Sequence, residues 1–126
     1  MPKVLLVDDE PVIRGALRKL FQRGGLEVEE AASAREALAA IAADPGIEAV
    51  VSDFIMPEID GLTFYDELIT RAPRLRDRVV FLTGAARDPS VHGPLEQRGV
   101  PLIHKLDDLQ IVLDAVRLAI LRGPVA

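Results

Sequence analysis

The sequence predicts an α/β domain in which a parallel five-stranded sheet carries helices on both of its faces. Short β-branched runs alternate five times with longer stretches of helical periodicity, which is typical of βα units joined by right-handed crossovers. The first run, Lys3-Val-Leu-Leu-Val7, is continuously apolar, as expected for a central parallel strand covered on both sides. A length of 126 residues suffices for one domain with a single buried core, and the chain has no internal linker or low-complexity segment.

Two βα units make up the first third of the chain. After the first strand, apolar residues recur at helical spacing from Ile13 to Phe21, and a pair of glycines ends this helix. Polar and apolar residues alternate in the second strand, as in a half-exposed edge strand. Ser33 and Glu36 have the spacing of a capping box, and an Asp-Pro-Gly segment stops the helix that they open. The expected elements are the strands 3–7 and 26–30 and the helices 13–23 and 33–41.

Three further βα units follow. Met-Pro and Asp-Gly turns separate the third strand from a helix that closes before Pro73. The next helix has the weakest pattern, because Pro89, Gly93 and Pro94 all oppose a long helix there. An apolar stripe marks the last helix. The expected elements are the strands 49–51, 79–82 and 100–103 and the helices 62–72, 87–98 and 109–120.

Composition narrows the class of protein. The apolar share of 49% and the charged share of 28% are those of a globular chain, and the absence of cysteine excludes disulfides and thiolate metal sites. The formal charge is −5 and the basic residues are scattered, so we expect no direct binding to nucleic acid. No apolar run is long enough to span a bilayer, and the start lacks the layout of a signal peptide. We therefore expect a cytoplasmic protein without membrane contact, and allow for a weak dimer.

Residues that carry chemistry follow four of the five expected strands. They are Asp8 and Asp9 after the first, Asp53 after the third, Thr83 after the fourth and Lys105 after the fifth. In sheets of this kind, ligands bind at the carboxyl ends of the strands, near the point where the strand order reverses. We therefore expect these side chains to converge at one edge of the sheet.

The three aspartates at this edge favour a bound cation. Without one they would repel each other, and at least one would be pushed toward protonation. Mg²⁺ prefers oxygen ligands and typically takes a few carboxylates together with water and a phosphate oxygen. Asp53 would then be a metal-held nucleophile facing a donor phosphoryl group. Lys105 is placed as a point charge for the phosphoryl oxygens, and Thr83 as a hydroxyl donor to them.

Each of these residues also has a purely structural interpretation. Asp9 stands just before Glu10 and Pro11 and could cap the first helix. Asp53 could be an ordinary turn residue, Thr83 with the following glycine a helix cap and a turn, and Lys105 a solvated surface charge. Four such coincidences at one edge of one sheet make the functional interpretation the stronger one.

Four segments resemble the signature of the response-regulator receiver family of two-component signalling, and the resemblance covers nearly the whole chain. The last two segments are more similar to receivers attached to hybrid sensor kinases than to those of transcription factors. The segments are Leu5-Leu-Val-Asp-Asp-Glu-Pro11, Val51-Ser-Asp-Phe-Ile-Met-Pro-Glu-Ile-Asp-Gly61, Phe81-Leu-Thr-Gly84 and His104-Lys105.

The resemblance implies a fold, a site and a function. The fold would be a flavodoxin-like doubly wound sheet of strand order 2-1-3-4-5 with five helices, formed by a receiver domain at 1–122 and followed by a tail at 123–126. The donor would be a phosphohistidine on a sensor histidine kinase or a phosphotransfer domain, and phosphorylation would switch a surface bound by a downstream protein. The chain would be a signalling switch and not an enzyme. The implied site comprises the phosphoacceptor Asp53, the Mg²⁺ ligands Asp8, Asp9, Asp53 and the backbone carbonyl of Ile55, and the switch residues Thr83 and Lys105.

Two departures from the family pattern keep an alternative open. Lys105 is followed by Leu106 and not by proline, and the connection into the last helix is short; Leu102 replaces an aromatic switch residue. The alternative is a pseudoreceiver, a receiver-shaped interaction module that is never phosphorylated. A phosphatase of the haloacid-dehalogenase type is excluded, because it needs a second aspartate where this chain has Ile55.

Overall fold

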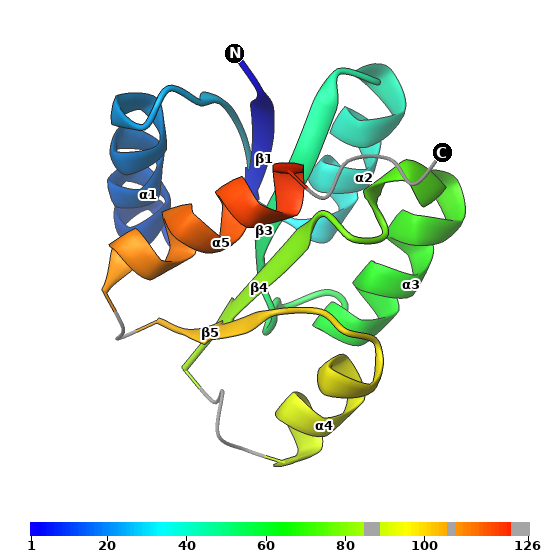
Figure 1. The fold of residues 1–126 in the computed structure, drawn as a ribbon. Helices are drawn as coiled ribbons and strands as arrows, with labels where there is room; N and C mark the ends of the chain where they lie inside the picture. The colour runs from blue at the N-terminus through cyan, green and yellow to red at the C-terminus, as the bar shows by residue number, and fades with distance from the viewer. Residues whose placement is uncertain (85–88, 106–107, 122–126) are drawn as a thin grey trace.

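The computed structural model describes residues 1–84, 89–105 and 108–121 and places five parallel strands in one sheet (Figure 1). The spatial order of the strands is β2-β1-β3-β4-β5, which confirms the expected order. β2 lies at one edge, in agreement with its alternating pattern. The strands are β1 (Lys3–Val7), β2 (Glu27–Ala31), β3 (Ile47–Asp53), β4 (Val79–Thr83) and β5 (Leu102–His104).

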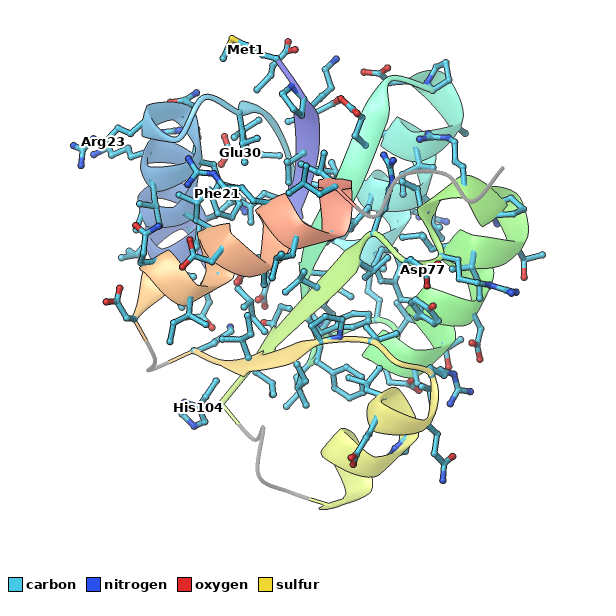
Figure 2. All side chains as sticks on the ribbon, viewed as in Figure 1. Met1, Phe21, Arg23, Glu30, Asp77 and His104 are labelled. Atoms are coloured by element: carbon cyan, nitrogen blue, oxygen red, sulfur yellow. The ribbon has the colours of Figure 1, made fainter. Side chains whose placement is uncertain are left out.

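Helices connect successive strands and cover both faces of the sheet (Figure 1). Because successive side chains of a strand point to opposite faces, β1 contributes to two separate cores. Leu5 and Val7 pack with residues of α2 and α3, whereas Val4 and Leu6 pack with residues of α1 and α5, among them the fully buried Phe21 (Figure 2). The helices are α1 (Pro11–Arg23), α2 (Ala34–Ala43), α3 (Gly61–Arg71), α4 (Pro89–Gln97) and α5 (Leu109–Leu121), with a 3-10 turn η1 (Pro73–Leu75).

Local signals start and end the first helices as expected. The Ser33 hydroxyl accepts a hydrogen bond from the Glu36 N–H at 3.2 Å, and the Glu36 carboxylate accepts one from the Ala32 N–H at 3.2 Å. This is close to a capping box at the start of α2, with the Glu36 carboxylate reaching the N–H one residue before the N-cap. α1 ends at a glycine pair in which Gly25 has φ +85°, a conformation that side chains with a Cβ rarely adopt.

The fifth strand differs from its expected range. It was expected at 100–103 and is found at Leu102–His104. Pro101 has no N–H with which to continue the ladder, although its carbonyl accepts a hydrogen bond from the Phe81 N–H at 2.9 Å. β5 therefore begins only after the proline.

Other differences concern short features. α4 forms over Pro89–Gln97 although Pro94 lies inside it. Neither η1 nor the antiparallel bridge between Ile55 and Asp60 was expected. The expected tail at 123–126 and the short connection that begins at Leu106 lie outside the described residues. Among the residues described, no helix has the length and apolarity needed to cross a membrane.

Candidate functional site

The residues expected in the site lie at the carboxyl ends of neighbouring strands. Sheet hydrogen bonds continue just past these ends and fix the backbone there. The Phe54 N–H donates to the Leu82 carbonyl at 2.8 Å, and the Lys105 N–H donates to the Thr83 carbonyl at 3.0 Å. Thr83 is thus the last residue of β4 and is fully buried. Parallel pairing explains why residues far apart in the sequence meet at this edge.

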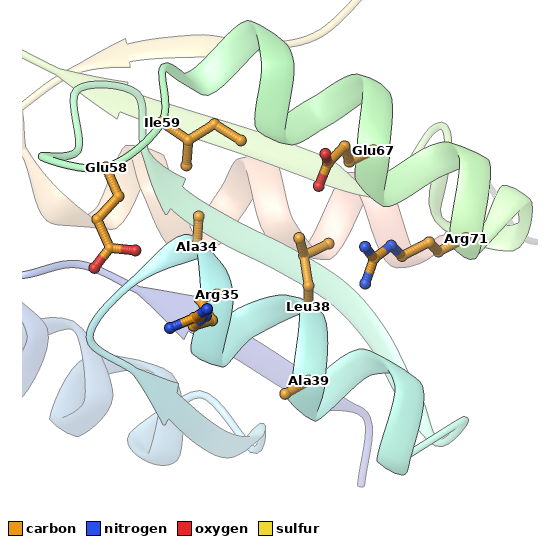
Figure 3. A pocket seen from close by; sticks show the side chains of 8 residues that line it. All are labelled: Ala34, Arg35, Leu38, Ala39, Glu58, Ile59, Glu67 and Arg71. Carbon is orange, nitrogen blue, oxygen red and sulfur yellow. The ribbon is translucent and has the colours of Figure 1, made fainter.

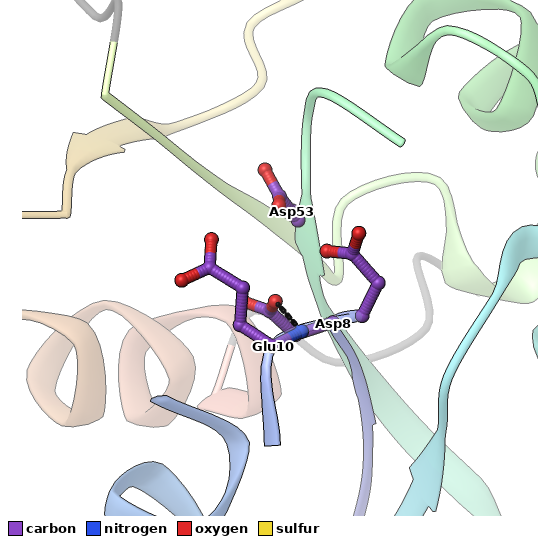
Figure 4. Close-up of side chains that lie close together, drawn as sticks. Asp8, Glu10 and Asp53 are labelled. Carbon is purple, nitrogen blue, oxygen red and sulfur yellow. Dashed lines mark hydrogen bonds between the residues drawn. The ribbon is translucent and has the colours of Figure 1, made fainter. Parts of the chain in front are cut away.

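Four carboxylates gather at this edge. One carboxylate oxygen from each of Asp8, Asp9, Glu10 and Asp53 lies within 4.8 Å of the others. Asp8 and Asp53 are buried, whereas Asp9 and Glu10 are exposed. Figure 4 draws Asp8, Glu10 and Asp53 around a common space, with the Glu10 N–H donating to Asp8 Oδ1 at 2.9 Å. The cluster has the donor chemistry that a hard divalent cation prefers.

Lys105 supplies a positive charge to this cluster. Its Nζ donates to Asp53 Oδ2 at 2.8 Å and to Glu10 Oε1 at 2.9 Å, and it lies 3.6 Å from Asp8 Oδ2. Burial lowers the pKa of Lys105, but the hydrogen bonds to Asp53 and Glu10 outweigh it, and the pKa lies above its ordinary value. Lys105 is therefore a protonated counter-charge and not a free surface lysine.

Asp8 shows most directly that the cluster suits a cation. Its Oδ2 is buried and has no hydrogen-bond partner among the described residues. Burial raises the pKa of Asp8, although the hydrogen bond from the Glu10 N–H and the charge of Lys105 act in the opposite direction. The Asp8 carbonyl accepts a hydrogen bond from Arg14 Nη1 at 2.6 Å, which anchors the turn that carries the acids. The opposite charge close to Asp8 Oδ2 is Lys105 Nζ at 3.6 Å, and a buried carboxylate oxygen that accepts no hydrogen bond is suited to be a metal ligand.

The turn after β3 is built around Asp53. Its Oδ1 accepts a hydrogen bond from the Ile55 N–H at 3.1 Å, and Ile55 pairs with Asp60 across the turn. Asp53 itself is the last residue of β3, so only its side chain takes part in the turn, and the same carboxylate also binds Lys105 through Oδ2. The Ile55 side chain is exposed beside it.

The structure corrects the capping roles considered for Asp9 and Thr83, although the glycine after Thr83 does lie in a turn. The N-cap residue of α1 is Glu10, not Asp9. Thr83 does not cap a helix, because it belongs to β4 and the following helix begins at Pro89. Sequence reasoning missed Glu10 as a member of the cluster. Its position directly after two strand-end acids and before Pro11, which starts the helix, is the signal that could have found it.

A separate hollow of about 460 Å³ lies between α2 and α3 (Figure 3). Ala34 and Leu38 of α2 form part of its apolar floor, and charged side chains such as Arg35 and Glu67 line it as well. The residues expected in the site do not line it. The candidate site at the strand ends is therefore separate from this hollow.

Known proteins are similar to this chain in sequence. A sequence model described as the response regulator receiver domain matches residues 4–117. A protein-glutamate methylesterase/protein-glutamine glutaminase of Anaeromyxobacter dehalogenans is 37% identical over 105 residues, which cover 82% of this chain and 29% of that protein. The sensor kinase CckA of Brucella abortus is 44% identical over 87 residues, which cover 68% of this chain and 9% of that protein. The chain thus spans less than a third of either relative.

Solved structures share the fold. A response regulator receiver domain protein from Clostridium thermocellum superposes with a TM-score of 0.84 at 26% identity, over 97% of this chain and 96% of that one. The response regulator protein TrrA from Thermotoga maritima, in complex with Mg²⁺ and BeF, has a TM-score of 0.80 at 25% identity, over 94% of this chain and 98% of that one.

Proposed function

The chain belongs to the response regulator receiver domain family, and on this premise we propose that Asp53 accepts a phosphoryl group from a phosphohistidine. The observation that carries the proposal is the contact between Asp53 and Lys105. Asp53 is buried at the end of β3, yet its Oδ2 faces a protonated lysine at 2.8 Å inside a cluster of acids. A nucleophilic carboxylate with a cation beside it suits attack on an anionic phosphoryl group.

Mg²⁺ is part of the proposal. The residues that would hold it are Asp8, Asp9 and Asp53 through their carboxylates and Ile55 through its backbone carbonyl. The proximity of four carboxylate oxygens supports this assignment, and so does Asp8 Oδ2, which accepts no hydrogen bond from any described residue. When bound there, Mg²⁺ would neutralise charge on the oxygens of the transferring phosphoryl group.

The protein's own groups would carry the transfer. An Asp53 carboxylate oxygen attacks the phosphorus in line, and the new O–P bond forms while the P–N bond to the donor imidazole breaks. The electron pair of that bond leaves with the imidazole nitrogen. Lys105 then offers its ammonium, and Thr83 its hydroxyl, to the phosphoryl oxygens. The Thr83 shift toward them would bias the surface that the following segment forms.

The partners follow from this chemistry. The donor is a sensor histidine kinase or a phosphotransfer domain, and the output is a changed surface for a downstream protein. The receiver unit would extend over residues 1–122, with 123–126 as a tail. The resemblance to a sensor kinase over 87 residues supports a place in such a phosphorelay.

Intact mass after incubation with acetyl phosphate and Mg²⁺ tests the proposal. The unmodified sequence is expected to gain one phosphoryl group and Asp53→Asn none, because the nearly isosteric amide is no nucleophile. Asp77→Asn is the control, because it changes an exposed acid just before β4. A gain by Asp53→Asn equal to that of the control would place the acceptor elsewhere.

The pseudoreceiver is the second candidate, and Leu102 is the observation that favours it. Leu102 is half-buried on β5 and packs against the core on the side of α2 and α3. An aliphatic side chain there cannot act as an aromatic rotamer switch. No gain of mass by the unmodified sequence, together with unchanged amide resonances at millimolar Mg²⁺, would favour this candidate.

A further inference from the structure

Glu10 belongs to the acidic cluster but lies outside the set of residues proposed to bind Mg²⁺. It is the first acid beyond Asp8 and Asp9, and its extended backbone caps α1. Its side chain is about half exposed, so it could turn toward solvent. Instead, Oε1 accepts a hydrogen bond from Lys105 Nζ at 2.9 Å. Glu10 thus contacts a lysine 95 positions away in the sequence, although its side chain is half exposed. This contact suggests a role for Glu10 in the site.

Lys105 is held from two sides. Its backbone N–H is fixed on the Thr83 carbonyl, so β5 determines where its side chain starts. Its ammonium lies between Asp53 Oδ2 and Glu10 Oε1, at 2.8 and 2.9 Å. Asp53 fixes the inner side of the ammonium and Glu10 the outer side. The position of Nζ therefore depends on an acid that would take no direct part in the transfer.

We propose that Glu10 is a positioning residue that keeps the Lys105 ammonium at the rim of the site throughout phosphoryl transfer. This role rests on the proposed function of Asp53. A divalent cation held by Asp8 and Asp53 would weaken the attraction of both carboxylates for Lys105, because it would supply their counter-charge. Glu10 still pairs with the ammonium, and the long lysine chain remains close enough to meet the phosphoryl oxygens. Without Glu10, the ammonium would either compete for Asp53 or turn into solvent.

The contact predicts an effect that depends on Lys105. Glu10→Gln removes the charged acceptor and keeps the shape of the side chain. Glu58→Gln is the matched control, because Glu58 is an exposed acid in the turn after β3 and is not a member of the acidic cluster found among the described residues. Both variants change the net charge equally, so a general effect on anionic donors or on Mg²⁺ attraction appears in both. Repeating both changes in a Lys105→Met background completes a double-mutant cycle.

Two measurements decide the proposal. The first is the rate of phosphoryl uptake from acetyl phosphate at saturating Mg²⁺. Glu10→Gln should lower it by roughly threefold to fivefold relative to Glu58→Gln, the ratio expected for one half-exposed ion pair. In the Lys105→Met background the two variants should be equal. The second is the NMR signal of the Lys105 ammonium in the presence of Mg²⁺, whose proton exchange should become faster in Glu10→Gln and stay unchanged in Glu58→Gln.

The outcomes separate this role from the proposed function. Equal rates and equal ammonium signals for Glu10→Gln and Glu58→Gln would overturn the positioning role while leaving Asp53 as the acceptor. A Glu10→Gln effect that persists in full without Lys105 would also overturn it, because Glu10 would then act on the donor or the cation. An unmodified sequence that binds no Mg²⁺ and takes up no phosphoryl group would remove the proposed function and this role with it.

Discussion

Asp8 is a charged residue that the fold solvates poorly. It is 1% exposed, and one of its carboxylate oxygens has no hydrogen-bond partner in the described part of the chain. Burial raises its pKa, so folding favours the protonated acid. The stability gained in this way is fully present below the pKa that Asp8 has in the unfolded chain. It is lost as the pH rises through the pKa that Asp8 has in the folded protein. At neutral pH, without a cation, the Asp8 carboxylate therefore destabilises the fold.

Replacement of Asp8 should consequently stabilise the metal-free protein. Asp8→Asn removes the buried charge with little change of shape, and we expect the free energy of unfolding at pH 7 to rise by about 1 kcal/mol in the presence of a chelator. Urea unfolding at pH 7 and at a pH below the ordinary pKa of aspartate measures it. The gain should shrink at the lower pH. A variant that is less stable than the parent at pH 7 would show that Asp8 contributes structurally as a carboxylate.

Among the elements, the start of α3 sets the position of the turn after Asp53. Asp60 caps the helix, because its Oδ1 accepts a hydrogen bond from the Thr63 N–H at 2.8 Å. Gly61 follows, and a Cβ there would lie 2.4 Å from Phe54 Cδ1 and 2.7 Å from the Phe54 carbonyl oxygen. Phe54 directly follows Asp53. The close approach of α3 thus fixes the backbone next to the proposed acceptor.

Gly61→Ala should therefore disturb both stability and the site. The backbone carbonyl of Phe54 cannot move away without shifting Asp53, and we expect a loss of about 1–3 kcal/mol in the free energy of unfolding. Phosphoryl uptake should also slow down. Gly15→Ala is the control, because Gly15 lies within α1 with open space around an added Cβ, and there alanine should stabilise by roughly 0.5–1 kcal/mol. Equal effects of the two substitutions would contradict the close-packing argument.

α4 is the helix whose sequence opposes it most. Pro94 removes a backbone donor inside a nine-residue helix, and Gly93 next to it adds little helix propensity. Leu95 is a fully buried residue of this helix and packs in the core on the side of α2 and α3. A short helix with these residues should open more readily than its neighbours.

We expect the response to phosphorylation to be concentrated between 84 and 99, with little change around Leu102. Leu102 lacks the ring that would transmit a rotamer change, whereas α4 contains Gly93 and Pro94, which oppose a helix. Hydrogen exchange with and without beryllofluoride measures both regions. Changes in protection spread evenly through 100–109, or none between 84 and 99, would contradict this prediction.

The sequence predicted the order of the elements better than their limits. Continuous apolar runs identify β1 and β4, because strands covered by helices on both faces are apolar throughout and do not alternate with polar residues. The limits of β5 depend on Pro101, which has no N–H, and on the hydrogen bonds between β5 and β4. A pattern of hydrophobicity predicts neither of these features. η1 and the bridge of Ile55 with Asp60 are too short to have a period. Tertiary contacts determine them.

For the candidate site, the sequence predicted which strand-end residues come together but not all of their side-chain contacts. Asp8 and Lys105 directly follow β1 and β5, and Asp53 ends β3, so topology alone brings them together. The Lys105 contact with Glu10 and the Arg14 contact with the Asp8 carbonyl depend on where long side chains reach across a turn. Spacing along the chain does not contain that information, and both contacts appeared only in the structure.

At the scale of the whole molecule, the site lies on the boundary between the two cores. β1 and β3 each send side chains to both faces of the sheet, and Asp8 and Asp53 lie at the carboxyl ends of these strands. A cation bound by Asp8 and Asp53 would link two central strands of the same sheet. Global unfolding should separate these ligands, so cation binding and the stability of the whole fold should be coupled.

Mg²⁺ should therefore stabilise the entire domain and not only the site. Receiver-sized single domains usually unfold in one cooperative step, and a ligand that binds only the folded state adds about 1.4 kcal/mol at a concentration near ten times its Kd. Thermal unfolding should shift upward with millimolar Mg²⁺ and return to its starting value with a chelator. NaCl at the same ionic strength is the control for general screening of the acidic chain. The Asp8→Asn protein should start from a higher stability and gain less from Mg²⁺, because it has lost both the buried charge and a ligand. If NaCl gave the same shift as Mg²⁺, or if Asp8→Asn gained as much as the parent, the acids would be screened rather than bound, and the cluster would not be a metal site.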